Sequence, residues 1–194
     1  MVFLFIDSGY SMRMNKLQHL NADLIQTLGL KLILTNDDAR KSKSCLIATM
    51  ILSSPLFIVA ANEWVPAYGL TRVVRRETTN VSQAFARLQL ARASTCYRLL
   101  DSLVSMPKEG EPVLVLEFLH TFYDADIPLR VRFFKLRECC RHLKYLARYR
   151  PIIVMAHEMQ TEDYEKFIPA LRSIANKTIY LEPELEQDIQ PELF

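Results

Sequence analysis

The residues at positions 37–44 could bind phosphate, because they end in a Lys-Ser pair between an apolar run and a helix-like segment. A phosphate-binding loop has the pattern G-x-x-x-x-G-K-[ST] between a strand and a helix. Lys43 and Ser44 occupy its last two positions, where a lysine contacts phosphate and a hydroxyl ligates Mg²⁺. Asp37 and Ser42 stand where the pattern has glycines.

The loss of both glycines weakens the case for a nucleotide site. The loop binds phosphate by turning backbone N–H groups inward, which requires glycine conformations and close backbone approach. Asp37 and Asp38 also place two negative charges where phosphates would sit, and like charges 4 Å apart cost about 4 kcal/mol at an effective dielectric of about 20. The sequence therefore favours a vestigial loop over a tight site for ATP and Mg²⁺, and we predict no bound cofactor.

Glu117 is a second candidate, because it ends the apolar run Val113–Leu116. Open α/β sheets bind ligands at the carboxyl ends of their strands, and an acid there can position Mg²⁺. The alternative, which we favour, is a carboxylate satisfied by a cap or an ion pair. His157 and Glu158 follow the next apolar run and would lie at the same edge, where an ordinary exposed histidine is the favoured interpretation. No Ser-His-Asp or Cys-His arrangement and no metal-ligand spacing is present, so we predict no catalytic or metal-binding residues.

A basic helix is expected over residues 129–149. Residues 129–150 hold eight Lys or Arg and one acid, a net charge of +7, so the whole-chain charge of +2 leaves −5 for the remainder. Arginine and lysine on one helix face can track a phosphate backbone without reading bases. We predict DNA binding by Arg130, Arg132, Arg137, Arg141, Lys144 and Arg148. His120, Phe122 and Tyr123 precede this helix and could stack on bases. The alternatives are a solvated helix face, or charge matching with the acidic segment 182–194.

The pattern of apolar runs predicts the fold. Half of the 194 residues are apolar, so one domain over residues 1–181 is expected, followed by the acidic tail 182–194. Buried strands alternate with helices, which predicts an α/β fold whose mostly parallel sheet has five or six strands and helices on both faces. The strands are expected at 31–35, 56–60, 88–93, 112–119, 152–156 and 178–181, and the helices at 14–28, 42–52, 95–106, 129–149 and 161–176. Ser94 or Thr95 is expected to cap the helix at 95–106, and Leu129 to lie on the apolar face of the helix at 129–149. Pro169 predicts a kink in the last helix or its division into two pieces. Residues 62–80 are expected to be an irregular connection. One or two helical turns are expected to follow it at 81–87.

The cysteines and the apolar runs bear on the cellular compartment. Cys45, Cys96, Cys139 and Cys140 lack CxxC spacing. Cys45, Cys96 and Cys140 sit at apolar positions, which is typical of buried thiols in a reducing compartment. No apolar stretch approaches the roughly 18 residues of a membrane span. We therefore expect a soluble intracellular protein, in the cytoplasm or nucleus, without a membrane partner.

Three segments together resemble the core of the RecA-type recombinases, most closely the archaeal and eukaryotic recombinases and their paralogues. Ala91-Arg92-Ala93, followed by a leucine-rich helix, resembles the "ARA" strand of that family. Val113 to Glu117 resembles its Walker B strand. Residues 123–130, with the basic helix and the run 152–156, resemble the stretch from the first DNA-binding loop to the next core strand. The resemblance covers residues 32–181.

The resemblance implies a RecA-like fold and work in homologous recombination or DNA repair. It implies that Lys43 and Ser44 hold nucleotide phosphates and Mg²⁺, that Glu117 lies near the metal, and that Arg130 and Arg132 lie in or beside the first DNA loop. The chain departs from the family pattern in its Walker A glycines. It also places Ala60 and Ala61 where the catalytic glutamate is expected, with Glu63 offset.

We therefore expect a non-hydrolysing recombinase paralogue. It would be a DNA-binding accessory subunit whose partners are single-stranded DNA and recombinase or paralogue subunits, in an oligomer or a heteromeric complex. The alternatives are a protein-interaction scaffold subunit without a nucleic-acid role, and a weak ATPase.

Overall fold

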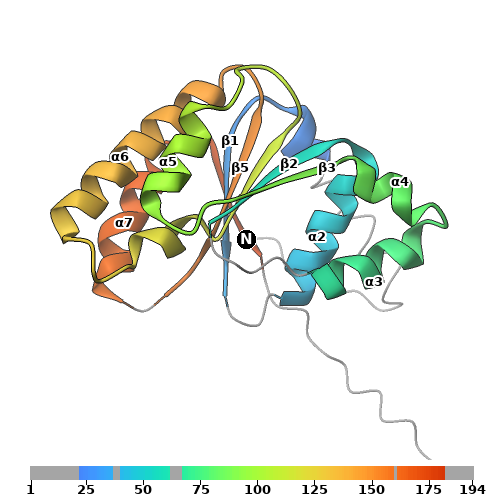
Figure 1. Ribbon diagram of the computed structural model, residues 1–194, viewed down its shortest axis with the longest axis horizontal. Helices are drawn as coiled ribbons and strands as arrows, with labels where there is room; N and C mark the ends of the chain where they lie inside the picture. The colour runs from blue at the N-terminus through green and yellow to red at the C-terminus, as the bar shows by residue number, and fades with distance from the viewer. Residues whose placement is uncertain (1–21, 37–39, 62–66, 160, 182–194) are drawn as a thin grey trace, which may run out of the picture.

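A six-stranded parallel sheet forms the centre of the protein. The computed structural model describes residues 22–36, 40–61, 67–159 and 161–181. The strands lie in the order β3-β2-β4-β5-β1-β6, and every pairing is parallel. Figure 1 shows the strands running between two groups of helices. Their bounds are Gly29–Thr35 (β1), Leu56–Ala60 (β2), Leu88–Arg92 (β3), Val113–Leu116 (β4), Pro151–His157 (β5) and Lys177–Leu181 (β6). The predicted α/β class is confirmed, and this architecture is consistent with a RecA-like α/β fold.

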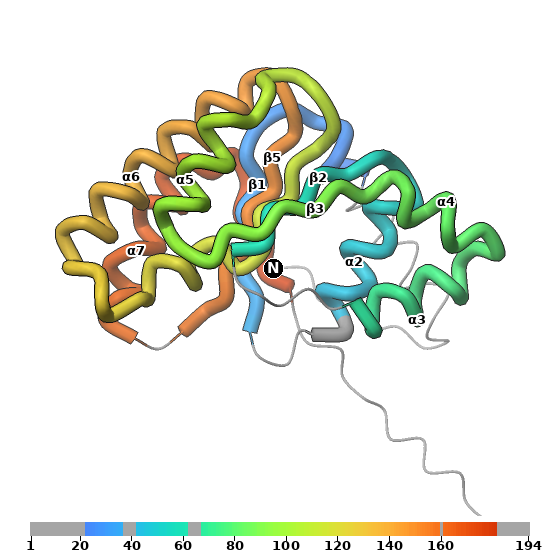
Figure 2. Tube along the Cα trace, viewed as in Figure 1, coloured from blue at the N-terminus to red at the C-terminus, as the bar shows by residue number. Residues whose placement is uncertain are grey.

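Helices cover both faces of the sheet, as predicted. One layer consists of α2 (Arg40–Ser53), α3 (Ala67–Glu77) and α4 (Val81–Ala86). The other consists of α5 (Cys96–Val104), α6 (Leu129–Leu146) and α7 (Glu162–Arg172), and the two layers stand on opposite sides of the strands in Figure 2. A short 3-10 helix, η2 (Phe118–Phe122), follows β4. Residues 22–26 are helical and add Leu24 and Ile25 to the core of the first layer.

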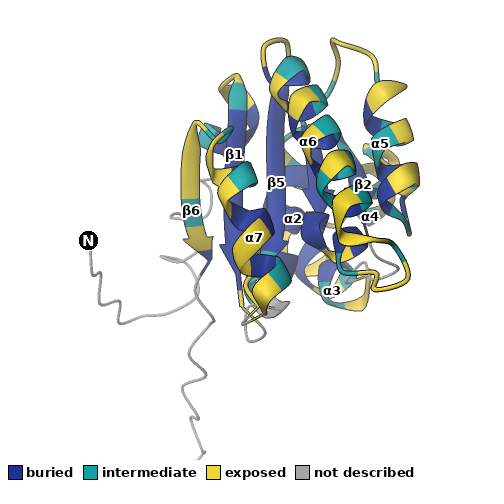
Figure 3. Ribbon diagram, turned by 90° about the vertical axis from the view of Figure 1, so that its left-hand side faces the viewer, coloured by how far each residue is buried: buried dark blue, intermediate teal, exposed yellow. Residues whose placement is uncertain are grey.

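The central strands are buried on both faces, which explains their continuous apolar runs. In β5, Ile152 and Val154 pack with α5, α6 and α7, whereas Ile153 and Met155 pack with α2 and α3. The same alternation in the neighbouring strands divides the core into two clusters, one under each helical layer. Figure 3 shows the buried strands at the centre and the exposed residues on the outer sides of the helices.

The structure corrects the expectation of an irregular connection at residues 62–80. Residues 67–77 form α3, whose Leu70, Val73 and Val74 are buried. Gly69 and the two β-branched valines lower helix propensity, so the packing of this apolar face on α2 is what stabilises the helix. Residues 62–66 lie outside the described residues, as do most of the helix predicted at 14–28 and the acidic tail 182–194.

Three further details differ from the sequence-based expectation. β4 ends at Leu116, and Phe118 and Leu119 belong to η2 instead of the strand. Leu129, predicted on the buried face of α6, is 36% exposed because it lies at the first residue of that helix. α7 is one helix that includes Pro169, where a kink or two pieces were predicted.

The structure confirms the predicted burial of two cysteines. Cys96 and Cys140 are buried, as expected, whereas Cys45 is only partly buried; Cys139 is buried as well. Burial raises the pKa of the Cys140 thiol to about 12, as expected for a cysteine in the core. Among the described residues, no helix is both long and apolar enough to cross a membrane.

Arg150 organises the loop that leads into β4. Its side chain is 3% exposed. Nε donates a hydrogen bond to the carbonyl of Glu111 at 2.7 Å, and Nη1 donates to the carbonyl of Pro107 at 3.1 Å. Gly110 has a φ of +142°, and a Cβ there would lie 3.1 Å from Nη2 of Arg150. The loop is thus wrapped around a buried guanidinium.

We expect Arg150→Ala to lower the free energy of unfolding by about 2–3 kcal/mol, because the partly buried carbonyl groups of Pro107 and Glu111 lose their donor. Urea denaturation followed by circular dichroism measures this change. Arg148→Ala, which removes an exposed arginine two residues earlier, should shift stability by less than about 0.5 kcal/mol. Equal midpoints for the two variants would contradict the structural role of Arg150.

Candidate functional site

Lys43 and Glu117, two candidates from the sequence, form a buried ion pair. Nζ of Lys43 lies 2.7 Å from Oε1 of Glu117, and the two side chains are 8% and 12% exposed. Lys43 comes from the first turn of α2, and Glu117 follows β4 directly. The sheet therefore brings together two residues that are 74 positions apart in the chain.

The backbone of Glu117 is held in an unusual conformation. Its φ of 52° and ψ of 42° lie in the left-handed region, and no other non-glycine residue among those described has a positive φ. This conformation costs roughly 1–2 kcal/mol for a residue with a side chain. Such outliers cluster at functional sites and persist only where the surroundings hold them. Here the left-handed residue turns the chain from β4 into η2.

The environment of Lys43 and Ser44 does not favour a phosphate. The carboxylate of Glu117 already neutralises the lysine, and it would repel a phosphate that approached the same ammonium group. Ser44 is 5% exposed, and a Cβ added to Gly69 of α3 would lie 2.7 Å from the Ser44 hydroxyl oxygen. The hydroxyl predicted to ligate Mg²⁺ is therefore covered by α3.

The carboxyl ends of β1, β4 and β5 bring further polar groups to this edge of the sheet. Thr35 and His157 are register partners at the ends of β1 and β5. Thr35 is 1% exposed, and its hydroxyl has no hydrogen-bond partner in the described part of the chain. Glu158 donates its backbone N–H to the carbonyl of Thr35 at 2.7 Å, which closes this edge locally. Within the described ranges, no group of three His, Cys, Asp or Glu side chains could hold a metal ion.

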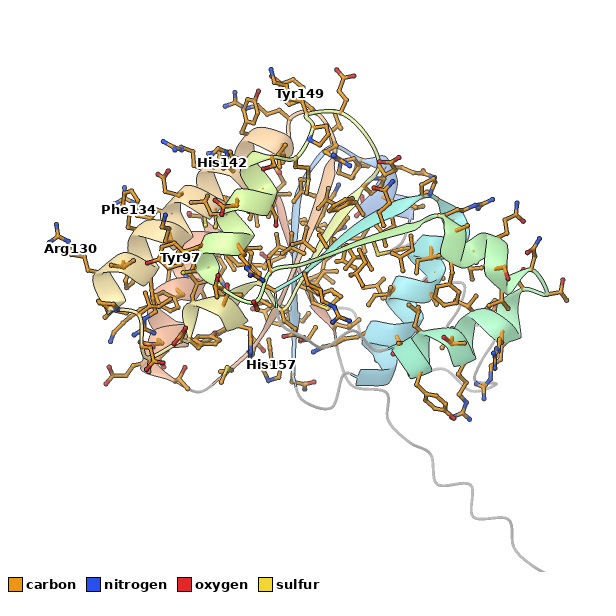
Figure 4. All side chains as sticks on the ribbon, in the orientation of Figure 1. Tyr97, Arg130, Phe134, His142, Tyr149 and His157 are labelled. Atoms are coloured by element: carbon orange, nitrogen blue, oxygen red, sulfur yellow. The ribbon has the colours of Figure 1, made fainter. Side chains whose placement is uncertain are left out.

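Five of the six cations predicted to bind DNA form an exposed row on one side of the molecule, the basic stripe. Figure 4 shows Arg130 at one end of α6, Phe134 and His142 along its outer flank and Tyr149 just past its other end, with His157 apart at the edge of the sheet. At 1.5 Å per residue, the stripe spans about 27 Å. Its members are Arg130, Arg137, Arg141, Lys144 and Arg148, all exposed.

The stripe carries a net positive charge even though one of its members is paired. Glu138 accepts a bond from Arg141 at 2.6 Å, and the Arg141 side chain remains 68% exposed. An exposed pair of this kind contributes little stability and can exchange partners readily. The stripe can therefore present most of its charge to an anionic partner.

Arg132, the sixth predicted DNA-binding residue, is not part of this surface. It is 8% exposed, and its Nη1 donates to the carbonyl of Phe122 at 3.0 Å and to Asp163 at 2.5 Å. The helical spacing turns its side chain inward, where it joins α6 to α7. Phe122, which was expected to stack on bases, is also fully buried, and it contacts the Phe167 ring. Both residues are structural.

Aromatic side chains beside the stripe were not predicted as part of the site. The ammonium of Lys135 lies 4.9 Å from the ring centroid of Tyr97 and 6.0 Å from that of Phe134, which is 59% exposed. Lys108 lies in the same way over Tyr145 and Tyr149. Phe134 lies between Arg130 and Arg137 at helical spacing. The sequence could therefore have indicated the aromatic group of Tyr97 and Phe134. The second group depends on a loop contact that the sequence does not show.

No protein-family model matches this sequence, and no curated protein is significantly similar to it. The geometry of the ion pair and of the basic stripe is therefore the basis for the functional argument.

We expect Lys43→Met and Glu117→Gln each to destabilise the protein by about 3 kcal/mol, because each leaves a buried group without its partner. The double variant should cost less than the sum, with a coupling energy of at least about 1 kcal/mol in a double-mutant cycle of urea unfolding. The exposed pair of Lys166 and Glu162, 2.9 Å apart, provides the matched control. Its coupling should stay below about 0.5 kcal/mol. If the two cycles gave the same coupling, the buried pair would have no special role.

Proposed function

We propose that this protein binds DNA through the basic stripe and acts as a non-hydrolysing, RecA-like accessory subunit in homologous recombination or DNA repair. The observation that carries the proposal is the exposed row of four arginines and one lysine on a single helix flank. Cations that neutralise phosphates release condensed counterions, and this release supplies most of the affinity of sequence-independent DNA binding.

The surroundings of the stripe favour a single strand as the partner. Cations that follow a backbone combine with exposed aromatic rings in proteins that bind single-stranded DNA without sequence preference. Phe134, Tyr97 and Tyr149 are 59%, 44% and 43% exposed on or next to this flank. Their rings offer stacking surfaces that bases can use only when they are not already stacked in a duplex.

The ion pair supports the non-hydrolysing part of the proposal. Hydrolysis requires a lysine that contacts the transferred phosphate and a carboxylate that acts on Mg²⁺. In this protein Lys43 and Glu117 contact each other at 2.7 Å, and α3 covers Ser44. The six-stranded parallel sheet is consistent with a RecA-like framework around that edge.

The same exposed rings favour one alternative, an interaction subunit without a nucleic-acid role. Phe134 projects an apolar ring between Arg130 and Arg137, and aromatic and arginine side chains are enriched at protein interfaces. An acidic protein partner would satisfy this surface as well as DNA would. The DNA-binding experiment below decides between the two.

We expect the protein to bind a fluorescein-labelled single-stranded oligonucleotide with an affinity that falls steeply with salt. Five phosphate contacts predict a slope of log K against log [salt] of about −3.5, because each contact contributes about −0.7 on a single strand. Arg137→Ala/Lys144→Ala should weaken binding and make this slope shallower by about 1.4. Fluorescence anisotropy over a salt series measures both quantities.

The control variant is Arg72→Ala/Arg75→Ala, which removes the same charge from exposed positions of α3 on the opposite face of the sheet. It should keep the slope of the parent. If the two double variants lost DNA affinity equally, binding would depend on the overall charge of the protein and not on the basic stripe. Absence of salt-dependent binding by the parent, alone and with any copurifying partner, would reject the proposal and favour the interaction subunit.

We expect Mg-ATP to leave DNA binding unchanged and to be hydrolysed no faster than in buffer. The reason is that the carboxylate of Glu117 is already paired with the ammonium group of Lys43, which a phosphate would need as its partner. A phosphate-release assay and the anisotropy titration repeated with Mg-ATP provide the measurements. Turnover that disappears in Lys43→Ala would instead identify an active ATPase.

A further inference from the structure

A groove opens between the C-terminal end of α5 and the outer side of α6, next to the basic stripe. Its volume is about 460 Å³, within the range of about 300–1,000 Å³ that is usual for ligand sites. Apolar side chains make up half of its lining, and basic or aromatic side chains make up the rest. Leu103, Val104 and Leu146 belong to the apolar half, and Lys108, Arg141 and Tyr145 belong to the other.

The charge of the groove is complementary to an anion. Lys108 and Arg141 contribute two positive charges, and none of the described residues that line the groove is acidic. Glu138, whose carboxylate pairs with Arg141 at 2.6 Å, lies outside the lining. Arg141 belongs to both the groove and the basic stripe. The groove is therefore continuous with the surface that contacts phosphates in the proposed function.

The aromatic wall of the groove is covered by a lysine. The ammonium of Lys108 lies 5.7 Å from the ring centroid of Tyr145 and 5.9 Å from that of Tyr149. The two rings are 5.4 Å apart in an edge-to-face arrangement. Lys108 itself is exposed and comes from a loop, so it can move off the rings at little cost. Figure 4 shows Tyr149 just beyond α6 and His142 on the flank of that helix.

We propose that this groove holds an unstacked base of single-stranded DNA, stacked on Tyr145, while Arg141 and Lys108 contact the phosphates on either side of it. This inference rests on the proposed function, because it assumes that the strand follows the basic stripe. It adds to that function a defined site for one base of the single strand. Bases inside a duplex are stacked and paired, and they do not enter a groove of this kind.

The occupant follows from the lining. A base presents two apolar faces, which match the apolar lining residues Leu103, Val104 and Leu146, and its π system matches the Tyr145 ring. The incoming base takes the place of the Lys108 ammonium over that ring. The displaced ammonium then lies beside the strand, where it contacts a flanking phosphate. Because every base has a stacking face, the groove selects for single strands without selecting a sequence.

The first test compares two 20-nucleotide probes of equal charge, a thymidine homopolymer and an abasic strand of the same length. We expect the parent protein to prefer the thymidine probe by about fivefold or more, the fold-change that corresponds to one stacked base. Tyr145→Ala should bind both probes equally and retain the salt slope of the parent. Tyr145→Phe keeps the ring and should retain the preference, which makes it the matched control.

The second test uses the unaltered protein, because Tyr145 also packs against the core and its removal could unfold the chain. A thymidine strand that carries 5-iodouracil is irradiated in the complex, and the crosslinked peptide is identified by mass spectrometry. The expected crosslink lies at Tyr145 or Tyr149. Crosslinks at Phe134 or Tyr97 alone would place the bases elsewhere and overturn the inference.

The outcomes separate this inference from the function on which it rests. Equal affinity of the parent for the two probes, with a steep salt dependence, would overturn the groove and leave the basic stripe intact. No affinity for either probe would reject both. A preference for thymidine that Tyr145→Ala retains, measured on a variant with parental circular dichroism, would also overturn the assignment of the groove.

Discussion

Burial of the central strands on both faces is the constraint from which the rest of the structure follows. β1, β4 and β5 carry apolar side chains in both directions, and a parallel sheet of this kind is stable only when both faces are covered. Two layers of helices result. The inner face of α6 packs on the sheet. Its outer face is exposed to solvent, so the residues there are not constrained by the core. The charges of α6 lie on that outer face, so they add a surface without disturbing the core.

The buried ion pair and the basic stripe differ in how their charges are compensated: the charges of the pair neutralise each other, whereas most cations of the stripe are solvated. Taking two charges out of water is costly, so Lys43 and Glu117 are stable there because each neutralises the other. Within the pair, the two charges at the carboxyl edge of the sheet neutralise each other. On the flank of α6 the cations remain solvated and far from most acids, which leaves their charge available for a partner. The protein thus combines a neutralised edge with a strongly cationic side.

Much of the fold was predictable from the sequence because the signals were local. Apolar runs bounded by glycine and proline marked the strands, and Ser94 or Thr95 was expected to cap α5, where Thr95 accepts a hydrogen bond from the Arg98 amide. α3 was missed because its sequence has weak helix propensity and becomes helical through packing on α2. The continuous helix at Pro169 was missed for a related reason, since tertiary contacts of Phe167 and Leu171 hold α7 together.

The candidate site was predictable in its residue types but not in its partners. The sequence by itself determined that Lys43, Ser44 and Glu117 would lie near the ends of strands, and that α6 would carry a row of cations, because helical and strand periodicity depend only on neighbouring residues. Only the tertiary structure decided that Lys43 pairs with Glu117, that Arg132 is buried with Asp163, and that Lys108 covers Tyr145. These contacts join residues 74, 31 and 37 positions apart. No local pattern encodes such pairs, because the order of strands and the packing of helices set the distances between them.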